Sequence, residues 1–275
     1  MKLDAHQHFW KFDPVRDAWI GEDMQLIRRD FMPEDLKPEL DKHQLDGCIA
    51  VQADQSEEEN EFLLSLSAQH PWIKGVVGWL DLLSDTLPER IDYYNGFSAF
   101  KGVRHILQAE PDGYMTQRKF VEGISSVGKS DLTYDILAKE GQLTEVLKLI
   151  KQLPEMRLVL DHIGKPDIKN ESFAHWATCM KSISELDHVY VKLSGMATEA
   201  DWATWQREDL QRYVDCCLEN FGPSRLMYGS DWPVCLVAGS YDRIHQSLMH
   251  CLQELSSDEQ NQIMGKTAKN FYQIT

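Results

Sequence analysis

Eight short apolar stretches recur along this chain, separated by segments with the spacing of amphipathic helices. An apolar run of about four to eight residues suits a strand that is buried on both faces of a parallel sheet. The stretches are 2–8, 47–53, 73–80, 100–106, 132–137, 157–163, 189–193 and 226–231. Helical spacing is clearest at 57–69, 142–153, 173–186, 206–221 and 240–255. Strand–helix alternation repeated eight times predicts an α/β fold, the (β/α)8 TIM barrel.

Signals at helix ends support this alternation. Ser56 followed by Glu59, and Ser257 followed by Gln260, have the spacing of capping boxes at helix N-termini. The 275 residues are slightly more than one barrel usually needs, and no low-complexity linker or break in composition divides them. We therefore expect a single barrel domain over 1–275.

The formal net charge of −16 excludes several kinds of partner. Such a chain repels nucleic acid and anionic membranes over most of its surface. No apolar run approaches the roughly 18 residues of a membrane span, and the charged segment 1–6 is unlike a signal peptide. The six cysteines form no Cys-x-x-Cys pair, which is typical of free thiols in a cytosolic protein. We expect a cytoplasmic protein with neither nucleic-acid nor membrane partners, and the sequence leaves assembly into a homo-oligomer open.

A pair of histidines, His6 and His8, ends the first predicted strand. Side chains two apart in a strand point to the same side, so both imidazoles can face the mouth of the barrel. There they are half of a metal site, or a pair of hydrogen-bond donors for a substrate carbonyl. Two unrelated histidines in a buried strand would be the simpler interpretation of an isolated His-x-His, but this pair has partners downstream.

His162 and Asp231 follow the sixth and eighth predicted strands. A carboxylate that arrives directly after an apolar strand needs a partner, and a metal ion or a catalytic water supplies one. The structural alternatives are that Asp231 caps a helix and that Asp161 holds a loop. Since the carboxyl ends of all barrel strands meet at one face, we expect a catalytic site there. Its candidate residues are His6, His8, His162 and Asp231.

These motifs resemble the amidohydrolase superfamily, and within it the branch of sugar-lactone and pyrone-dicarboxylate lactonases. They are His6-x-His8, Asp161-His162-Ile163-Gly164-Lys165-Pro166, Tyr228-Gly229-Ser230-Asp231-Trp232-Pro233, 51–53, 78–79, 100–105, 193–195 and 265–272. The resemblance covers essentially the whole chain and is strongest to the L-fuconolactonase and L-rhamnonolactonase types. It implies a hydrolase of carbohydrate metabolism, such as fucose catabolism, that opens a small sugar lactone.

One departure from the superfamily pattern limits the metal content. Two-metal amidohydrolases carry a histidine on the fifth strand, whereas the stretch 132–137 contains none. The resemblance also implies that lactone opening in this branch needs no metal. We expect either no required cofactor or a single divalent ion, Zn²⁺ above others, and the ligands would be His6, His8, His162 and Asp231.

Cationic, amide and aromatic side chains near the strand ends are candidates for substrate binding. They are Gln52, Trp79, Lys101, Arg104, His105, Lys165 and Trp232. Strand periodicity puts Lys101 and His105 on one side and Arg104 on the other, so all three can serve only if the strand ends near Val103. The aromatic rings either stack on a sugar ring or pack the loops.

A lactone hydrolase must direct water to the carbonyl carbon, stabilise the oxyanion and protonate the leaving alkoxide. In this scheme Asp231 is the general base, and the histidines, or one metal ion that they hold, polarise the carbonyl. The alternatives are a metal-dependent non-oxidative decarboxylase and a dicarboxylate-pyrone lactonase of the same superfamily. The missing fifth-strand histidine counts against the decarboxylase. A non-catalytic sugar-binding barrel would have no reason to keep the four polar residues.

Overall fold

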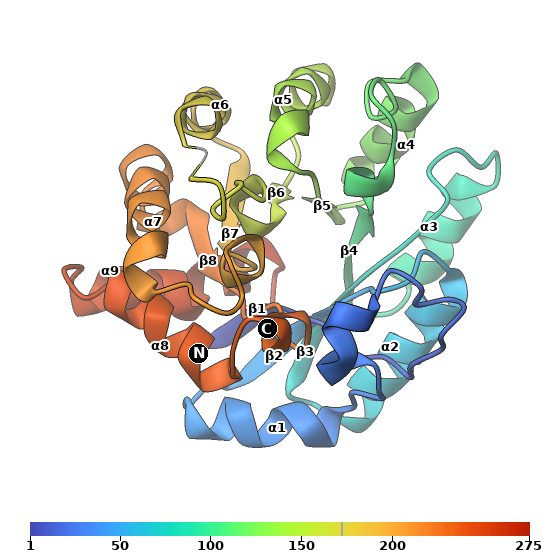
Figure 1. Cartoon of the computed structure of the whole chain (residues 1–275). Coiled ribbons are helices and arrows are strands. Elements are labelled where there is room, and N and C mark those ends of the chain that lie inside the picture. The colour runs from blue at the N-terminus through green and yellow to red at the C-terminus, as the bar shows by residue number, and fades with distance from the viewer. Residues whose placement is uncertain (172) are drawn as a thin grey trace.

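The computed structural model describes residues 1–171 and 173–275, which form eight strands and confirm the predicted barrel. The strands are β1 (Leu3–Gln7), β2 (Gly47–Val51), β3 (Ile73–Gly78), β4 (Phe100–His105), β5 (Thr133–Ile136), β6 (Leu158–Leu160), β7 (Val189–Leu193) and β8 (Leu226–Tyr228). Each strand pairs in parallel with the next one along the chain. Every strand falls within a predicted apolar stretch (Figure 1).

Helices alternate with the strands and surround the sheet (Figure 1). They are α1 (Pro33–Lys42), α2 (Glu57–Gln69), α3 (Leu87–Asn95), α4 (Arg118–Lys129), α5 (Leu143–Gln152), α6 (Ala174–Ser184), α7 (Arg207–Phe221), α8 (Tyr241–Cys251), α9 (Ser257–Asn261) and α10 (Thr267–Phe271). In α5 the buried residues Leu143, Val146, Leu149 and Ile150 follow the spacing of one helix face. The five segments with clear helical spacing are all helical, so the periodicity predicted the outer layer correctly.

The helix caps agree only in part with the prediction. Ser56 Oγ accepts from Glu59 N at 3.3 Å as predicted, but the Glu59 carboxylate binds a backbone amide of the β2–α2 loop instead of completing the box. The capping box predicted at Ser257 and Gln260 is wrong by one residue, because the observed box begins one residue earlier. Ser256 caps α9, and the Glu259 carboxylate accepts from Ser256 N at 2.9 Å.

The barrel closes between β1 and β8 through the backbone of residues at or just beyond the strand ends. Asp231 N donates to His6 O at 2.8 Å, and His8 N donates to Trp232 O at 2.7 Å. Gly229 permits this close approach, because a Cβ at that position would lie 2.6 Å from the Cβ of His6. The closing seam therefore contains four of the predicted site residues, namely His6, His8, Asp231 and Trp232.

β6 and β8 each end three residues before their apolar patterns predict. β6 ends at Leu160 and β8 at Tyr228. His162 and Asp231 lie in the turns beyond, with φ angles of 54° and 58°. Such angles are uncommon for residues other than glycine, and they tend to occur where the surroundings hold a functional side chain in place. The apolar run misled the prediction because the turn is buried too, as Ile163 shows.

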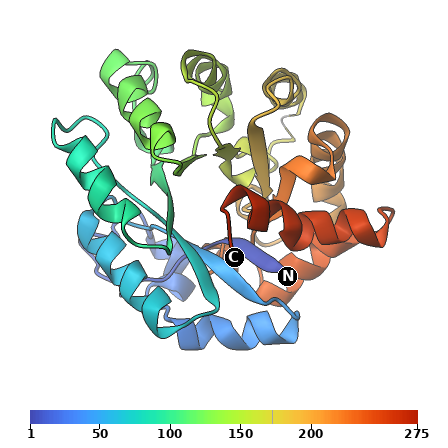
Figure 2. The ribbon, with the colours of Figure 1, turned by 180° about the vertical axis from the view of Figure 1, so that it is seen from behind.

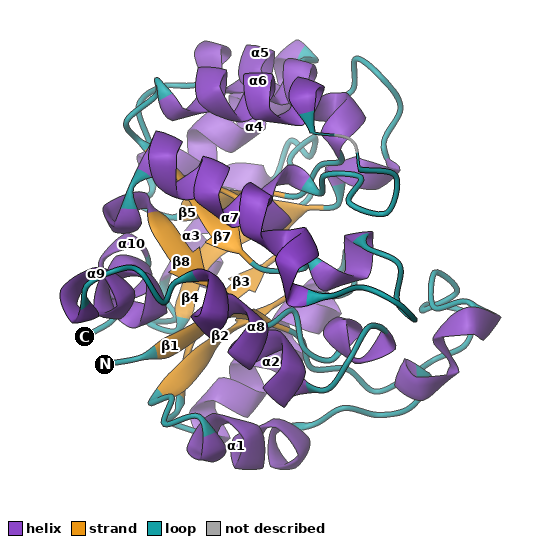
Figure 3. Ribbon diagram, turned by 60° about the vertical axis from the view of Figure 1, so that its left-hand side comes forward, coloured by secondary structure: helices purple, strands orange, loops and turns teal. Residues whose placement is uncertain are grey.

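The two ends of the barrel differ. At the end where the strands begin, Phe271 and Tyr272 of the C-terminal segment pack in one apolar cluster with Leu3 and Val159. Figure 2 shows this segment lying beside the start of β1. At the other end the long loops project away from the termini (Figure 3). The carboxyl ends of the strands are therefore the face on which a ligand can enter.

Within the described residues, no helix combines the length and the apolar composition that crossing a membrane requires. The six cysteines are all buried and free.

Candidate active site

Four predicted residues meet at the carboxyl ends of the strands. The ring centroid of His6 lies 5.0 Å from that of His8 and 4.3 Å from that of His162. Asp231 Oδ1 lies 3.5 Å from His8 Nε2 and 3.9 Å from the Nε2 atoms of His6 and His162. All four side chains are buried. Segments far apart in the sequence thus bring one carboxylate and three imidazoles together.

His8 is oriented by the neighbouring strand β2. Its Nδ1 lies 2.7 Å from the backbone oxygen of Val51. A carbonyl oxygen can only accept, so His8 Nδ1 carries a proton. His8 Nε2 faces Asp231 and His6 at the centre of the cluster.

His162 is held by the two residues that follow β7. Ser194 Oγ lies 2.9 Å from His162 Nδ1, which leaves Nε2 toward Asp231. Gly195 has a φ of 61°, and a Cβ there would come within 2.5 Å of His162 Nδ1. Glycine is required at this position both for the backbone conformation and for the close approach of the imidazole.

Burial and the neighbouring side chains shift the pKa values of this cluster. Burial lowers the pKa of His6 and of His162 well below the usual histidine value. Burial opposes ionisation of Asp231, but the interactions with His162, His8 and the Lys165 ammonium outweigh it, and the pKa of Asp231 falls below its ordinary value. An ionised carboxylate in such surroundings can accept a proton from water at neutral pH.

A charged cluster that the sequence reasoning missed lies below His6 inside the barrel. Lys192 of β7 and Asp135 of β5 are fully buried, with Nζ and Oδ2 2.5 Å apart. Lys192 Nζ also lies 3.0 Å from Asp161 Oδ1 and 3.1 Å from His6 Nδ1. The sequence did contain a signal. A charged residue within an apolar strand is almost never fully buried unless it is paired, and β5 and β7 each carry one.

Arg104 connects this cluster to the space above the barrel. Its Nη1 lies 3.2 Å from Asp161 Oδ2 and 3.3 Å from His6 Nε2. Its Nη2 donates to the backbone oxygen of Gln52, whose Nε2 donates to Arg104 O at 3.1 Å. Gln52, predicted to contact substrate, therefore holds the backbone and the guanidinium of Arg104.

Lys101 does not join the site. β4 runs through His105, so the strand does not end near Val103 and its periodicity separates Lys101 from Arg104. Lys101 lies at the start of the strand, with Nζ 3.4 Å from Gln273 O of the C-terminal segment. That is the opposite end of the barrel, and the suggestion that Lys101 contacts substrate is corrected on this ground.

Three predicted aromatic residues support the wall without lining the pocket. His105 Nε2 lies 2.8 Å from Glu110 Oε1, and its Nδ1 accepts from the indole of Trp79 at 3.4 Å. Trp232 is buried with its ring edge-on to Phe31 at 5.2 Å. For Trp79 and Trp232 the structure matches the loop-packing interpretation rather than direct stacking on a ligand. His105, predicted as a source of positive charge for the substrate, lies against Glu110 instead.

A pocket of about 320 Å³ opens above the cluster. Its lining includes His8, Arg104, His162, Lys165 and Asp231. The sequence reasoning missed other parts of the wall, namely Trp19, Ala53, Gln55, Ile106, Gln108, Ala109, Leu137 and Val234. Most of these residues come from loops, where no periodicity marks which side chain faces inward. Two indoles, those of Trp10 and Trp19, and two amides beside a carboxylate suit a small, cyclic, hydroxylated ligand.

The site fits a metal ion only in part. His6 Nε2 and His8 Nε2 lie 3.2 Å apart, close to the roughly 3.3 Å expected for tetrahedral ligands bonded at about 2.0–2.1 Å. The potential ligand sets are His6, His8 and Asp231, and His6, Asp161 and His162. Both sets depend on His6, whose Nδ1 faces the Lys192 ammonium and whose Nε2 faces the Arg104 guanidinium. His6 therefore fits poorly as a ligand.

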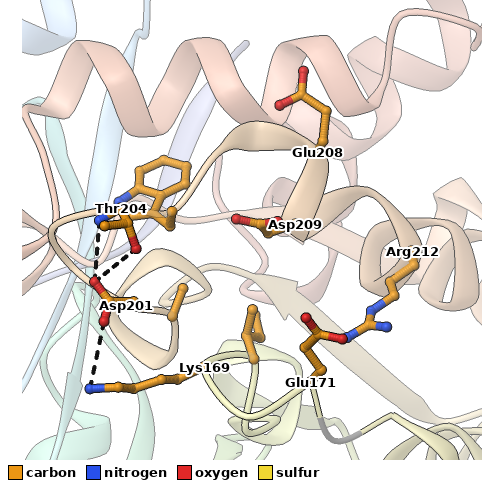
Figure 4. A pocket seen from close by; sticks show the side chains of 10 residues that line it. Lys169, Glu171, Asp201, Thr204, Glu208, Asp209 and Arg212 are labelled. Atoms are coloured by element: carbon orange, nitrogen blue, oxygen red, sulfur yellow. Dashed lines mark hydrogen bonds and ion pairs between the residues drawn. The ribbon is translucent and has the colours of Figure 1, made fainter.

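A second pocket of similar volume lies among the segments that follow β6 and β7 (Figure 4). Its charged residues are Lys169, Glu171, Asp201, Glu208, Asp209 and Arg212. Asp201 is already bound to Thr204 and Lys169. The lining contains none of the predicted catalytic residues, so the barrel pocket is the better candidate for chemistry.

The fold and the site together define a class of barrel hydrolases. Its features are a parallel barrel, His-x-His at β1, a histidine after β6 and an aspartate after β8. A family model described as amidohydrolase matches residues 3–274. The chain belongs to the amidohydrolase family, which confirms the resemblance inferred from its motifs.

Proteins of similar sequence and structure narrow the class of hydrolase that this chain resembles. The chain is 37% identical to an L-fucono-1,5-lactonase of Burkholderia multivorans over 286 residues, covering 100% of this chain and 96% of that protein. It is 32% identical to an L-fucono-1,5-lactonase of Burkholderia ambifaria, covering 99% and 96%. A crystal structure of an amidohydrolase from Burkholderia multivorans with bound zinc superposes with a TM-score of 0.97, at 37% identity and full coverage of both chains.

Proposed function

We propose that this chain is a lactonase that hydrolyses the ring ester of a small sugar lactone, with L-fucono-1,5-lactone as the preferred substrate. The observation that carries the proposal is the convergence of one carboxylate and two imidazoles in the lining of the pocket, with Asp231 Oδ1 3.5 Å from His8 Nε2 and 3.9 Å from His162 Nε2. The two relatives named L-fucono-1,5-lactonase support the choice of sugar. The pocket volume of about 320 Å³ is near the lower end for small-molecule sites and suits a single ring.

Asp231 supplies the proton transfers of the proposed reaction. Its carboxylate takes a proton from a water molecule as the water oxygen attacks the carbonyl carbon of the lactone. The tetrahedral oxyanion is stabilised by donors already in place, which are the imidazoles of His6 and His162 and the guanidinium of Arg104. As the ring C–O bond breaks, Asp231 returns the proton to the leaving alkoxide, and the product is the open hydroxy acid.

We further propose that the reaction requires no metal ion and that the site holds at most one, with Zn²⁺ suited to its nitrogen and oxygen ligands. When bound, such an ion would polarise the substrate carbonyl. The charges around His6 argue against a requirement for it, because Lys192 and Arg104 already place positive charge on both sides of this imidazole.

Two alternatives are less well supported. A dicarboxylate-pyrone lactonase must neutralise two substrate carboxylates, but the cations that line this pocket are already paired, Lys165 with Glu199 at 2.9 Å and Arg104 with Asp161 at 3.2 Å. A metal-dependent decarboxylase needs a complete ligand set. On β5, where two-metal members carry a histidine, Asp135 is bound to Lys192.

A substrate panel tests the proposal. The panel contains aldonolactones of different configuration and ring size, a pyrone dicarboxylate and a dihydroxybenzoate, assayed by acid release or decarboxylation, each with and without a chelator. We expect the highest kcat/KM with L-fucono-1,5-lactone, and most of that activity to survive chelation. Activity on the pyrone or the benzoate alone, or loss of all lactonase activity on chelation, would overturn the proposal.

A further inference from the structure

Trp19 is a large apolar side chain in the wall of the barrel pocket. It lines this pocket, yet 47% of its surface is exposed. Large apolar side chains are usually withdrawn from water, and an exposed one in the wall of a cavity is typical of a ligand-binding surface. The other indole of the wall, that of Trp10, is only 2% exposed. The two indoles therefore differ in how much of their surface a ligand can contact.

The two indoles also differ in their hydrogen bonds. Trp10 Nε1 donates to Arg29 O at 2.8 Å, so the donor of that ring is used inside the protein. Trp19 Nε1 donates to no acceptor among residues 1–171 and 173–275. An indole nitrogen can only donate. Trp19 therefore offers a ligand an unused donor at the edge of an apolar ring.

Ring contacts connect Trp19 to the proposed catalytic groups. The ring centroid of Trp10 lies 6.5 Å from that of His8 and 6.0 Å from that of Trp19. The three rings thus form a row that begins beside Asp231, which is 3.5 Å from His8, and ends at the half-exposed Trp19. The planes of Trp10 and Trp19 are nearly perpendicular, at 86°. Such a contact covers at most one face of either ring, so Trp19 keeps a broad face for a ligand.

The segment that carries Trp19 is held in place by the protein itself. Backbone bonds join its two ends, since Trp10 N donates to Phe31 O at 3.0 Å and Phe31 N donates to Trp10 O at 2.9 Å. Within the segment Asp17 and Ile20 are buried, and Ile20 N donates to Asp17 O at 2.9 Å. Contact with a side chain on a preorganised segment costs little additional ordering of the chain.

We propose that Trp19 is a substrate-binding residue that stacks on one face of the sugar ring and donates from Nε1 to a ring hydroxyl. A cyclic sugar has the matching surface, because its C–H bonds form an apolar face and its hydroxyl groups stand at the edge. A ring bound in this way lies on the wall that leads to His8 and Asp231. The role in turnover rests on the proposed lactonase activity, whereas binding of a sugar ring can be measured without it.

Two substitutions separate the apolar face from the donor. Trp19→Ala removes both, and Trp19→Phe keeps an aromatic face without the N–H group. With L-fucono-1,5-lactone we expect KM to rise about tenfold in Trp19→Ala and about threefold in Trp19→Phe, with kcat within about threefold of the wild type. δ-Valerolactone has the same ring without hydroxyl groups, so the kcat/KM of Trp19→Phe for it should match that of the wild type.

The control is Leu26→Ala, which changes an exposed residue of the same segment that does not line the pocket. It should match the wild type with both lactones. Binding of L-fucose then tests the inference without hydrolysis, because this sugar has the ring hydroxyl groups of the lactone but no ester bond. Its affinity, measured by calorimetry, should be about tenfold lower in Trp19→Ala than in the wild type and in Leu26→Ala.

An unchanged KM together with the same L-fucose binding in Trp19→Ala and the wild type would overturn the inference. A change of oligomeric state with unchanged L-fucose binding would also overturn it, because Trp19 would then cover an interface between copies of the chain. If the wild-type chain opens no lactone, the proposed function fails, while the L-fucose titration still decides whether Trp19 binds a sugar ring.

Discussion

The backbone amide of Asp231 donates to the backbone oxygen of His6 at 2.8 Å, so the proposed general base is joined to the first histidine of the site by a bond that closes the barrel. In a (β/α)8 barrel the catalytic residues stand at the ends of different strands, and their relative positions depend on closure of the sheet. Here the closing seam is part of the active site itself. Changes near this seam, or in the turns that hold the histidines, should affect catalysis as well as stability.

Replacing Gly195 by alanine tests how tightly His162 is held. A Cβ at Gly195 would lie 2.5 Å from His162 Nδ1, at a φ of 61° that disfavours side chains. We expect Gly195→Ala to displace the imidazole and lower kcat at least about tenfold, with a loss of about 1–3 kcal/mol in unfolding free energy. Gly141→Ala is the matched control, because nothing lies within 4 Å of its added Cβ. A Gly195→Ala enzyme with unchanged kcat would show that the position of His162 is unimportant.

The pH dependence of turnover should reflect the ionised state of Asp231. Because its pKa lies below the ordinary carboxyl value, the base form persists as the pH falls from neutral. We expect kcat/KM to stay within about twofold between about pH 7 and pH 5 and to decline only at lower pH. Circular dichroism at each pH checks that the fold is intact. A decline centred at pH 6 or above would mean that another group limits the reaction.

Asp4 gives a prediction about stability. Burial raises its pKa from 3.8 to about 6, against the hydrogen bonds that Ser230 and Tyr241 donate to it. The folded state therefore holds this proton more tightly than the unfolded state, and the stability that this proton provides is lost as the pH rises toward and through 6. The amide of Asp4→Asn does not titrate. Its unfolding free energy, measured in urea, should fall less between pH 5 and pH 8 than that of the wild type.

The control for this measurement is Asp92→Asn, which replaces an exposed carboxylate on α3. It should keep the pH dependence of the wild type. If Asp4→Asn and Asp92→Asn show the same pH slope, Asp4 does not carry an unusual proton.

Much of the fold could be predicted because its signals are local. Strands buried on both faces are apolar throughout, and the helices between them have one apolar face. The cluster of His6, His162 and Asp231 followed from the same pattern, since each polar residue interrupts or follows an apolar strand. The topology of the barrel then brings these points together.

The features that the sequence did not predict depend on the register of the strands and on the conformation of the loops. Lys101 was placed near the substrate because the end of β4 cannot be read from its sequence, and the structure puts Lys101 at the other end of that strand. Lys192 was overlooked within an apolar strand, although a buried lysine requires partners. Trp19 and Gln55 line the pocket from loops. Loop conformation depends on tertiary contacts that no sequence periodicity records.

The most direct test of the account is the turnover of Asp231→Asn with L-fucono-1,5-lactone under single-turnover conditions. The amide keeps the shape of the side chain but cannot accept the proton of the attacking water. We predict a fall of about 10³-fold or more in rate with the fold intact. The control Asp85→Asn replaces an exposed carboxylate that pairs with Lys119, and it should match the wild type. A folded Asp231→Asn enzyme that opens the lactone at near wild-type rate would contradict the account.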